Sequence, residues 1–362
     1  MELNGNFFEG VEKLLEIWFS QSEGSSGSGD ARNVSRYTWE TILDIVQCKI
    51  LDEIHDESQT AYLLSESSMF VSKRRVILKT CGTTLCLQAL PHIIKVLEDE
   101  CGLDTVADCF YSRKNFMKPD HQPHPHKTFQ DEIIYLNQVL SDKQHVNENQ
   151  VNGFSNNKHP GSASYCLGRI DGDCWFLYTL NHVGNTNLIG VDEPDQTLEI
   201  LMTDLDRTVM DKFVLCDENG DKHDDDKITE MTGIKDIIPD SKISAKLFDP
   251  CGYSMNGLLP EGQYWTIHVT PEEEFSYVSF ETNWKTGSYA GIIEKVVKLF
   301  KPGRFTMTLF ANKSSSLDIS DWCKPGGPYV EGFCHQDIQT ARLQDYGLFY
   351  TNYAKKQNMI KQ

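Results

Sequence analysis

The sequence lacks the long apolar runs of a membrane protein and the cysteine spacings of a disulfide or zinc protein. No apolar run in the 362 residues approaches the ~20 residues that span a bilayer. The segment Met1 to Gly5 carries no basic charge of the kind that opens a secretory signal. The eleven cysteines include no C-x-x-C pair and no zinc-like spacing with histidine, which favours free thiols in a reducing compartment. We therefore expect a cytosolic protein with no membrane partner and no metal.

Basic residues are also scarce. Lys and Arg number 34 against 53 Asp and Glu, which gives a formal net charge of −19. Nucleic-acid binding needs a basic footprint, so this balance excludes a nucleic-acid partner. Acidic charge is compatible with a cationic ligand, although most of these carboxylates are expected to form a solvated surface. An apolar content of 39% is typical of a globular protein, and the length allows a large core.

Three polar stretches interrupt the chain, at Gln21–Arg32, His145–Ser162 and Asp217–Asp226. They are rich in Gly, Ser, Asn or Asp, which indicates loops. Composition does not change across any of them. We therefore expect a single domain spanning residues 1–362 rather than two domains of different character.

Hydrophobic periodicity predicts both strands and helices. The segment Tyr264–Thr270 alternates strictly, with Trp265, Ile267 and Val269 on one face and His268 on the polar face. Further strands are expected at 275–282 and 304–310, and helices at 14–19 and 292–300. This mixture favours an α+β fold.

The segment Leu64–Thr84 carries the most specific chemistry. It contains Glu66 followed by Ser67, and a downstream thiol at Cys81. A serine hydroxyl can attack the carbonyl that precedes it if the backbone is strained there. On the local sequence alone, a polar strand end or turn is the favoured interpretation for the serines, and a buried structural cysteine is the alternative for Cys81. The continuous stretch, however, resembles the processing site of eukaryotic S-adenosylmethionine decarboxylases, a pyruvoyl-dependent family.

The resemblance extends from Phe7 to about residue 312, and the part from about 313 matches only weakly. It implies a four-layer αββα sandwich, with two antiparallel sheets stacked face to face and helices on the outer faces. It also implies that the domain cleaves itself into a small chain, 1–66, and a large chain, 67–362. The activity implied is decarboxylation of S-adenosylmethionine for spermidine and spermine synthesis.

The resemblance assigns each step of that chemistry to a residue of this chain. The resemblance implies that Ser67 becomes the pyruvoyl cofactor after cleavage at Glu66–Ser67, and that its ketone forms a Schiff base with the substrate. Cys81 would return a proton as general acid. His268 would remove the serine α-proton, and Ser254 would support the oxyoxazolidine intermediate of the acyl shift. A strand histidine that is simply hydrogen-bonded is the alternative for His268.

Other residues match the family's substrate and activator sites. Glu9 and Glu12 match carboxylates near the reaction centre, and Glu66 is counted among the substrate contacts. Phe8 and Phe248 match the rings that sandwich adenine, and Glu272 matches the carboxylate that holds the ribose hydroxyls. Asp249 differs from the asparagine that the family has at this position. For the phenylalanines, ordinary core packing is the alternative. The match to a putrescine-binding pocket comprises Glu16, Lys79, Phe110, Asp195, Thr197, Glu199, Glu281 and Phe310.

The expected partners are S-adenosylmethionine, putrescine as activator, and the two chains of one precursor. Family members from animals are often dimeric, so a homodimer is also considered. Two rival functions remain. One is a weak or inactive relative that acts as an activating partner subunit. That function would require the loss of Glu66–Ser67, or of Cys81 and His268, and all of these residues are present. The other is a thiol hydrolase that uses Cys81 and His268, for which the chain offers no recognisable motif.

Overall fold

A computed structural model describes residues 7–141, 161–180, 194–216, 222–317, 319–322, 327–343 and 345–356. The chain divides into two compact units. The N-terminal unit comprises Val11–Cys166 and Trp175–Ile189, and the C-terminal unit comprises Met1–Gly10, Leu167–Cys174 and Gly190–Gln362. Within the described ranges, no helix is long and apolar enough to cross a membrane.

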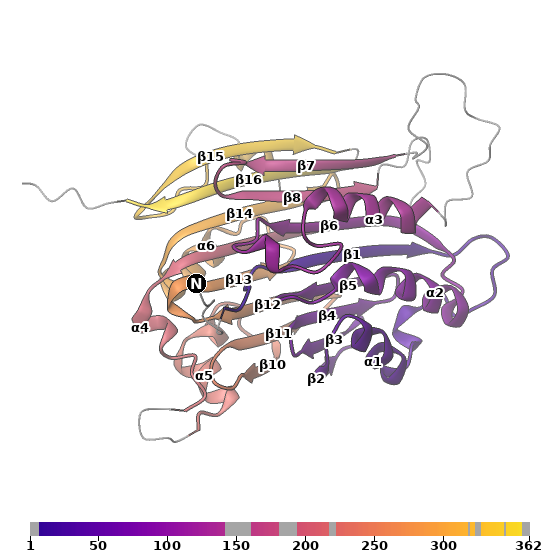
Figure 1. The fold of residues 1–362 in the computed structure, drawn as a ribbon, viewed down its shortest axis with the longest axis horizontal. Helices are drawn as coiled ribbons and strands as arrows, with labels where there is room; N and C mark the ends of the chain where they lie inside the picture. The colour runs from indigo at the N-terminus through magenta and orange to yellow at the C-terminus, as the bar shows by residue number, and fades with distance from the viewer. Residues whose placement is uncertain are drawn as a thin grey trace, which may run out of the picture. The chain divides into compact units, whose positions relative to one another are not determined.

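An eight-stranded sheet with the strand order β2-β3-β4-β5-β1-β6-β8-β7 carries the N-terminal unit (Figure 1). Its strands are β1 (Lys13–Ser20), β2 (Ile50–His55), β3 (Gln59–Leu64), β4 (Ser67–Ser72), β5 (Arg75–Thr80), β6 (Thr105–Lys114), β7 (Ser162–Gly168) and β8 (Cys174–Leu180). Its helices are α1 (Arg36–Ile45), α2 (Leu90–Cys101) and α3 (Phe129–Ser141), with short 3-10 helices η1 (Ala31–Asn33), η2 (Cys86–Ala89) and η3 (Pro119–His121).

A second eight-stranded sheet, β10-β11-β12-β13-β9-β14-β16-β15, carries the C-terminal unit (Figure 1). Its strands are β9 (Gln196–Leu205), β10 (Lys242–Leu247), β11 (Tyr253–Leu259), β12 (Gln263–Thr270), β13 (Tyr277–Thr282), β14 (Pro302–Asn312), β15 (Phe333–Arg342) and β16 (Tyr346–Lys355). Its helices are α4 (Arg207–Met210), α5 (Asp225–Met231), α6 (Ala290–Phe300), α7 (Ile319–Trp322), η5 (Ile234–Asp236) and η6 (Glu273–Phe275).

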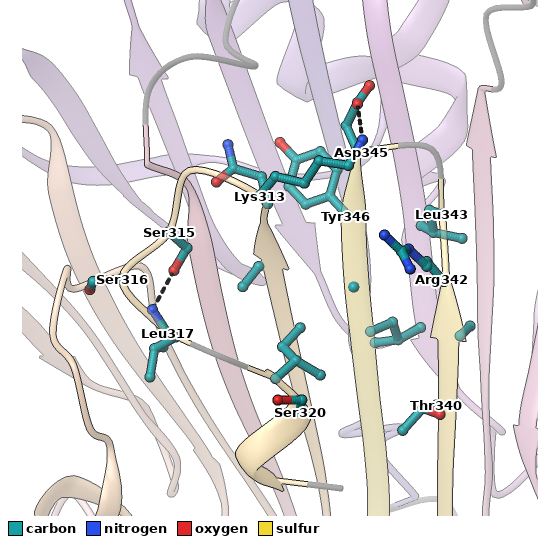
Figure 2. Close-up of a pocket in the computed structure, with 16 residues that line it drawn as sticks. Lys313, Ser315, Ser316, Leu317, Ser320, Thr340, Arg342, Leu343, Asp345 and Tyr346 are labelled. Atoms are coloured by element: carbon teal, nitrogen blue, oxygen red, sulfur yellow. Dashed lines mark hydrogen bonds and ion pairs between the residues drawn. The ribbon is translucent and has the colours of Figure 1, made fainter.

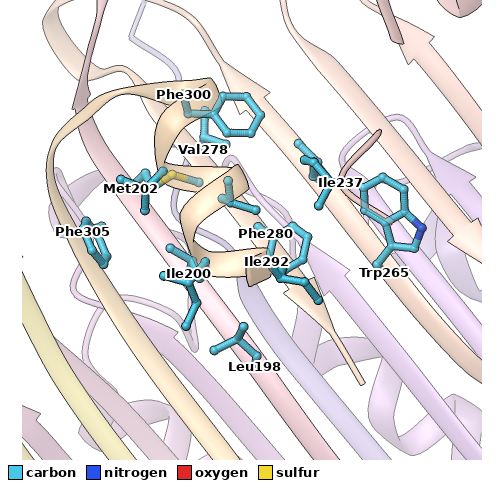
Figure 3. Packing of buried hydrophobic residues seen from close by; sticks show 14 of the residues in the cluster. Leu198, Ile200, Met202, Ile237, Trp265, Val278, Phe280, Ile292, Phe300 and Phe305 are labelled. Carbon is cyan, nitrogen blue, oxygen red and sulfur yellow. The ribbon is translucent and has the colours of Figure 1, made fainter. Parts of the chain in front are cut away.

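Each sheet buries one face under its helices. In the C-terminal unit, Ile292 and Phe300 of α6 pack on Ile200, Met202 and Phe280 of the strands (Figure 3). The N-terminal unit has an equivalent cluster formed by α1, α2, α3 and one face of its strands. The predicted α+β class, with two antiparallel sheets and helices, is therefore confirmed.

The opposite face of each sheet is also buried, but it is polar. In the C-terminal sheet it carries Thr266, His268 and Glu281, and in the N-terminal sheet it carries Ser68 and Lys79. Buried polar groups are costly unless they are hydrogen-bonded. Several of the predicted site residues, His268, Glu281 and Lys79 among them, lie on these polar faces.

The helix predicted at 14–19 is wrong, because these residues form β1. Leu15, Ile17 and Phe19 alternate into the core while Leu14, Glu16 and Trp18 lie on the other face. Trp18 covers the Arg75 guanidinium at 4.7 Å, which accounts for the apolar residue on the second face. A central strand that carries apolar groups on both faces produces the same spacing as a helix.

The other predicted strands and the second predicted helix are present in the structure. The strand at Tyr264–Thr270 lies within β12, that at 304–310 within β14, and the helix at 292–300 within α6. The strand predicted at 275–282 begins later, at Tyr277, because Glu273–Phe275 forms η6. Residues 21–30 link β1 to η1 as expected, whereas residues 145–160 and 217–221 lie outside the described part of the chain.

Candidate functional site

The Glu66–Ser67 peptide lies in the tight turn between β3 and β4. Ser67 is the first residue of β4, pairs with Leu64 of β3 and is almost fully buried. Its φ of +118° lies in a region that L-residues rarely adopt. Such a conformation costs on the order of 1–3 kcal/mol and persists only where the surrounding structure enforces it. The peptide bond before Ser67 is therefore held under strain.

Both partners of an acyl transfer at this bond are hydrogen-bonded. The Ser67 hydroxyl donates to Glu12 Oε1 at 2.6 Å. The Glu66 carbonyl oxygen accepts from the backbone N–H of Cys81 at 3.1 Å. A carboxylate that accepts the hydroxyl proton and an N–H that polarises the carbonyl are the two groups that such an attack requires. Lys79 Nζ, 3.4 Å from Glu12 Oε2, balances the buried carboxylate.

The Cys81 side chain lies beside the same turn, with its Sγ 3.8 Å from Glu66 Oε2. Burial raises the pKa of Cys81 well above that of an ordinary thiol, and the charges of Glu66 and Glu12 add to the effect. The thiol is therefore protonated at neutral pH. Burial also raises the pKa of the Glu66 carboxyl. A protonated thiol in this position can act as a proton donor.

In the C-terminal unit, His268 of β12 and Ser254 of β11 are cross-strand partners. His268 Nδ1 lies 2.8 Å from Ser254 Oγ, and Nε2 lies 2.8 Å from Thr266 Oγ1. Thr266 donates its own proton to the carbonyl of Met255 at 2.8 Å. With the Thr266 proton assigned to this carbonyl, or to Asn256 Oδ1 at 3.1 Å, its oxygen accepts from Nε2–H and Nδ1 accepts from Ser254. The network assigns Nδ1 as the base.

Sequence reasoning missed Thr266, although one signal for it was present. Thr266 lies two residues before His268 on a strictly alternating strand, so both share a face. The backbone N–H of Cys81 was also missed. No residue type marks that contact, because it depends on the register of β4 against β5.

The predicted substrate residues of the C-terminal unit lie near the ends of its strands. The ring of Phe7, beside Phe8 and Glu9, lies 4.7 Å from that of Phe275. A Cβ on Gly10 would come within 2.8 Å of Tyr277 Cβ, so this segment approaches the start of β13 as only glycine allows.

Phe248 and Glu272 lie in two further loops of the same unit. Phe248 follows β10 and donates its N–H to the carbonyl of Gly252 at 2.8 Å. Glu272 precedes η6, and burial raises the pKa of its carboxyl. Its Oε2 is buried and finds no hydrogen-bond partner within the described residues. An acceptor in this state suits a ligand hydroxyl.

The predicted activator residues divide between the units. In the C-terminal unit, Glu199 of β9 and Glu281 of β13 are direct cross-strand partners and both are buried. Tyr264 donates to Glu281 Oε1 at 2.6 Å, and Tyr346 donates to Asp195 Oδ2 at 3.0 Å. Two carboxylates facing each other on neighbouring strands repel one another, so the set suits a cation.

Phe310 and Thr197 complete the set in the C-terminal unit. They are cross-strand partners on β14 and β9, and the Phe310 ring stacks on Tyr346 with centroids 4.7 Å apart.

In the N-terminal unit, Glu16 of β1 and Phe110 of β6 are also cross-strand partners. Glu16 accepts from Trp18 Nε1 at 2.7 Å and lies 3.6 Å from Arg75. Lys79 is the third member, and it is fully buried beside Glu12. Glu16 and Lys79 thus each have an oppositely charged neighbour in this unit.

A surface hollow of about 530 Å³ lies at the ends of β14, β15 and β16 (Figure 2). Lys313 and Asp345 pair at 3.2 Å on its rim, and Tyr346 is shared with the acidic set. None of the predicted site residues lines this hollow, so it is separate from the proposed chemistry. Within the described residues, no group of His, Cys, Asp and Glu is arranged to hold a metal ion.

Comparisons with known proteins place the chain among similar proteins. The family model described as adenosylmethionine decarboxylase matches residues 5–354. The chain is 48% identical to the S-adenosylmethionine decarboxylase proenzyme of Xenopus laevis over 98% of both chains, and 43% identical to that of Drosophila melanogaster over 98% of this chain and 97% of the relative. The solved Trypanosoma brucei AdoMetDC-delta26 monomer aligns with a TM-score of 0.56 at 25% identity, over 80% of this chain and 99% of that one.

The family match and the relatives identify an enzyme of the decarboxylase class. The chain belongs to the adenosylmethionine decarboxylase family. This assignment argues against the thiol hydrolase.

Proposed function

We propose that the chain cleaves itself between Glu66 and Ser67 and then decarboxylates S-adenosylmethionine, which supplies the aminopropyl donor for spermidine and spermine synthesis. The observation that carries the proposal is the geometry at Ser67. A buried serine with φ of +118° places its hydroxyl on a carboxylate while the preceding carbonyl accepts a backbone N–H. The names of the relatives, which are proenzymes of this decarboxylase, point the same way.

Cleavage would begin as an acyl shift within the chain. Glu12 takes the proton of the Ser67 hydroxyl, and Oγ attacks the carbonyl carbon of Glu66. The Cys81 N–H stabilises the oxyanion, and the Ser254 hydroxyl is assigned the same task. The C–N bond then breaks, the nitrogen gains a proton, and an ester replaces the amide without any change in composition. Relief of the backbone strain at Ser67 favours this direction.

The ester would then break by β-elimination. His268 removes the α-proton of Ser67 through Nδ1, the Cβ–O bond breaks, and Glu66 leaves as a carboxylate. Water hydrolyses the resulting dehydroalanine and ammonia departs, so that a pyruvoyl group begins the large chain. The proposal assigns removal of the Ser67 α-proton to His268. A base that is oriented by hydrogen bonds at both ring nitrogens suits that task.

The surroundings of position 67 fit a pyruvoyl group, because the site is buried and a protonated thiol lies just beyond its strand partner Thr80. Such a group supplies a ketone that captures the substrate amine and accepts the electrons released with CO2. Cys81 donates the proton that replaces the lost carboxylate. Phe8 and Phe248 are assigned to the adenine ring, Glu272 to the ribose hydroxyls, and Glu9 and Glu66 to the reacting end of the substrate.

A dication is proposed as activator. Glu199 and Glu281 face each other on neighbouring strands, and Asp195 is oriented by Tyr346, so a diamine such as putrescine would neutralise a repulsive set. The cytosolic location, the single domain and the homodimer stay predictions. An inactive paralogue that activates a partner is the second candidate function. The presence of Glu66–Ser67, Cys81 and His268 disfavours it.

The deciding experiment compares Ser67→Ala with Ser72→Ala, a control on the same strand. Ser67→Ala removes the attacking oxygen, so the chain should stay intact on a denaturing gel and should show no decarboxylation. Ser72→Ala should separate into two chains like the wild type. Separation of the Ser67→Ala chain would disprove processing through this serine.

A further inference from the structure

Lys13 is a buried cation that the proposed reaction does not use. It opens β1, is fully buried, and is the cross-strand partner of Arg113 on β6. Burying an ammonium group is costly, and a second buried cation directly opposite adds to the cost. Glu132 lies 2.8 Å from Arg113 Nε and balances that guanidinium. A buried ammonium group needs hydrogen-bond partners, and the partners of Lys13 indicate what it does.

The ammonium group of Lys13 holds one backbone carbonyl. Lys13 Nζ donates to the Gly82 carbonyl oxygen at 2.9 Å and to Gln122 Oε1 at 3.3 Å. Gln122 Nε2 donates to the same Gly82 oxygen at 3.2 Å. Both side chains are buried, and the Phe116 ring lies 5.4 Å from Nζ. Two donors from separate segments thus fix the Gly82 carbonyl.

The Gly82 carbonyl sets the geometry of the turn that carries Cys81. Gly82 has a left-handed φ of +62°, which favours glycine. Directly before it, Cys81 directs its N–H at the Glu66 carbonyl and its thiol toward the Glu66 carboxyl. Thr84 Oγ1 donates to the Cys81 carbonyl at 2.7 Å. Any shift of Gly82 would therefore displace both functional groups of Cys81 together.

Lys13 also acts on Cys81 through its charge. Burial, Glu66 and Glu12 raise the pKa of the Cys81 thiol, whereas Lys13 lowers it, and buried Cys48 adds a small raising effect. The charge of Lys13 thus acts on the Cys81 thiol in the direction opposite to the charges of Glu66 and Glu12. Without it, the thiol would hold its proton to still higher pH.

We propose that Lys13 is a positioning residue which, together with Gln122, acts through Gly82 to aim the Cys81 N–H at the scissile carbonyl and the Cys81 thiol at the reacting carbon. The inference rests on the proposed function and deepens it. Misplacement of a reacting group by about 1 Å can cost about 100-fold in rate. Loss of the hydrogen bonds from Lys13 and Gln122 to the Gly82 carbonyl should therefore slow both the self-cleavage and the later decarboxylation.

The test compares Lys13→Met, Lys13→Gln and Gln122→Met with Lys95→Met, an exposed control that pairs with Asp99 on the surface. Lys13→Met should slow chain separation and lower kcat by about 10-fold or more, with KM changed by less than about 2-fold. A general acid is lost as pH rises through its pKa, so the alkaline fall of kcat should move to higher pH.

The other variants separate the hydrogen bond from the charge. Lys13→Gln keeps an N–H donor but loses the positive charge. It should therefore process faster than Lys13→Met, while its kcat should fall at the same higher pH as that of Lys13→Met. Gln122→Met removes one hydrogen-bond donor and no charge. It should therefore slow processing without changing the pH at which kcat falls on the alkaline side. Wild-type rates in a folded Lys13→Met protein would overturn the proposal. If Lys13→Met does not fold, wild-type processing by Gln122→Met would overturn it instead.

Failure of the proposed function gives a different pattern. If the wild type itself stays uncleaved, the pH dependence of Cys81 alkylation, followed by peptide mass spectrometry, replaces the rate measurements. Lys13→Met should move that alkylation to higher pH relative to Lys95→Met. An unmoved profile would overturn the role of Lys13 independently of any processing.

Discussion

The two regions that carry the proposed chemistry are built in different ways. Around Ser67 the backbone is strained, the turn is tight, and buried charges from Glu12 and Lys79 surround the hydroxyl. Around His268 the strands are regular, and neutral hydroxyls hold both ring nitrogens. A bond that must break gains from stored strain, whereas a base that must reach a specific proton gains from rigid orientation.

The sharpest way to separate the regions is His268→Ala. The acyl shift depends on Ser67, Glu12 and Cys81, so the ester should still form, but its α-proton should not be removed. Hydroxylamine, which attacks esters much faster than amides, should then cleave the variant at Ser67. His335→Ala, which removes another strand histidine bonded to a threonine hydroxyl, serves as the control. An intact, hydroxylamine-resistant His268→Ala chain would place the base elsewhere.

The charged region is tested by Glu12→Gln. The amide cannot take the proton of the Ser67 hydroxyl, so chain separation should slow by about 100-fold or more, as is typical for loss of a general base. Glu53→Gln, at a half-buried carboxylate that pairs with Arg36, is the control. A time course on a denaturing gel measures the rate. Equal rates for Glu12→Gln and the wild type would remove Glu12 from the acyl shift.

The orienting role of Thr266 predicts a smaller effect. Thr266→Val keeps the shape but removes the oxygen that accepts from His268 Nε2–H, so Nδ1 is no longer fixed as the base. The loss of one oriented hydrogen bond should slow ester breakdown by about 10-fold. Hydroxylamine-sensitive ester should accumulate transiently in a time course. If no ester accumulates and processing is unchanged, the tautomer is set by another group.

The smallest expected effect concerns activation by a diamine. Asp195→Asn removes a charge that Tyr346 orients, so putrescine should stimulate decarboxylation less than in the wild type, while cleavage at Ser67 persists. Coupling between two such sites is typically about 5- to 150-fold in affinity. Titration of putrescine into both proteins measures it. Equal stimulation would place the diamine elsewhere, and no stimulation of the wild type would make these carboxylates structural.

The sequence predicts the regular region better than the strained one. Strict alternation in β12 places His268 on the polar face without any knowledge of the fold. The same reasoning fails at β1, where apolar groups on both faces imitate a helix. Periodicity reports which face a side chain occupies, not how neighbouring strands register.

The strained region depends on such registers. The contact between Cys81 N–H and Glu66, the φ of Ser67 and the hold of Lys13 on Gly82 arise from segments brought together by folding. The importance of Ser67 came from family resemblance rather than from any pattern of spacing. Lys13, the first residue of a strand whose spacing resembled that of a helix, offered no local signal.

The central claim is that the chain cuts itself at the strained peptide, and an intact-mass spectrum of the purified wild-type protein tests it most directly. The account predicts two chains whose boundary lies between Glu66 and Ser67. The large chain should resist stepwise N-terminal degradation, because a pyruvoyl group has no amine. A single mass corresponding to the uncut 362-residue chain, in protein that decarboxylates S-adenosylmethionine, would contradict it.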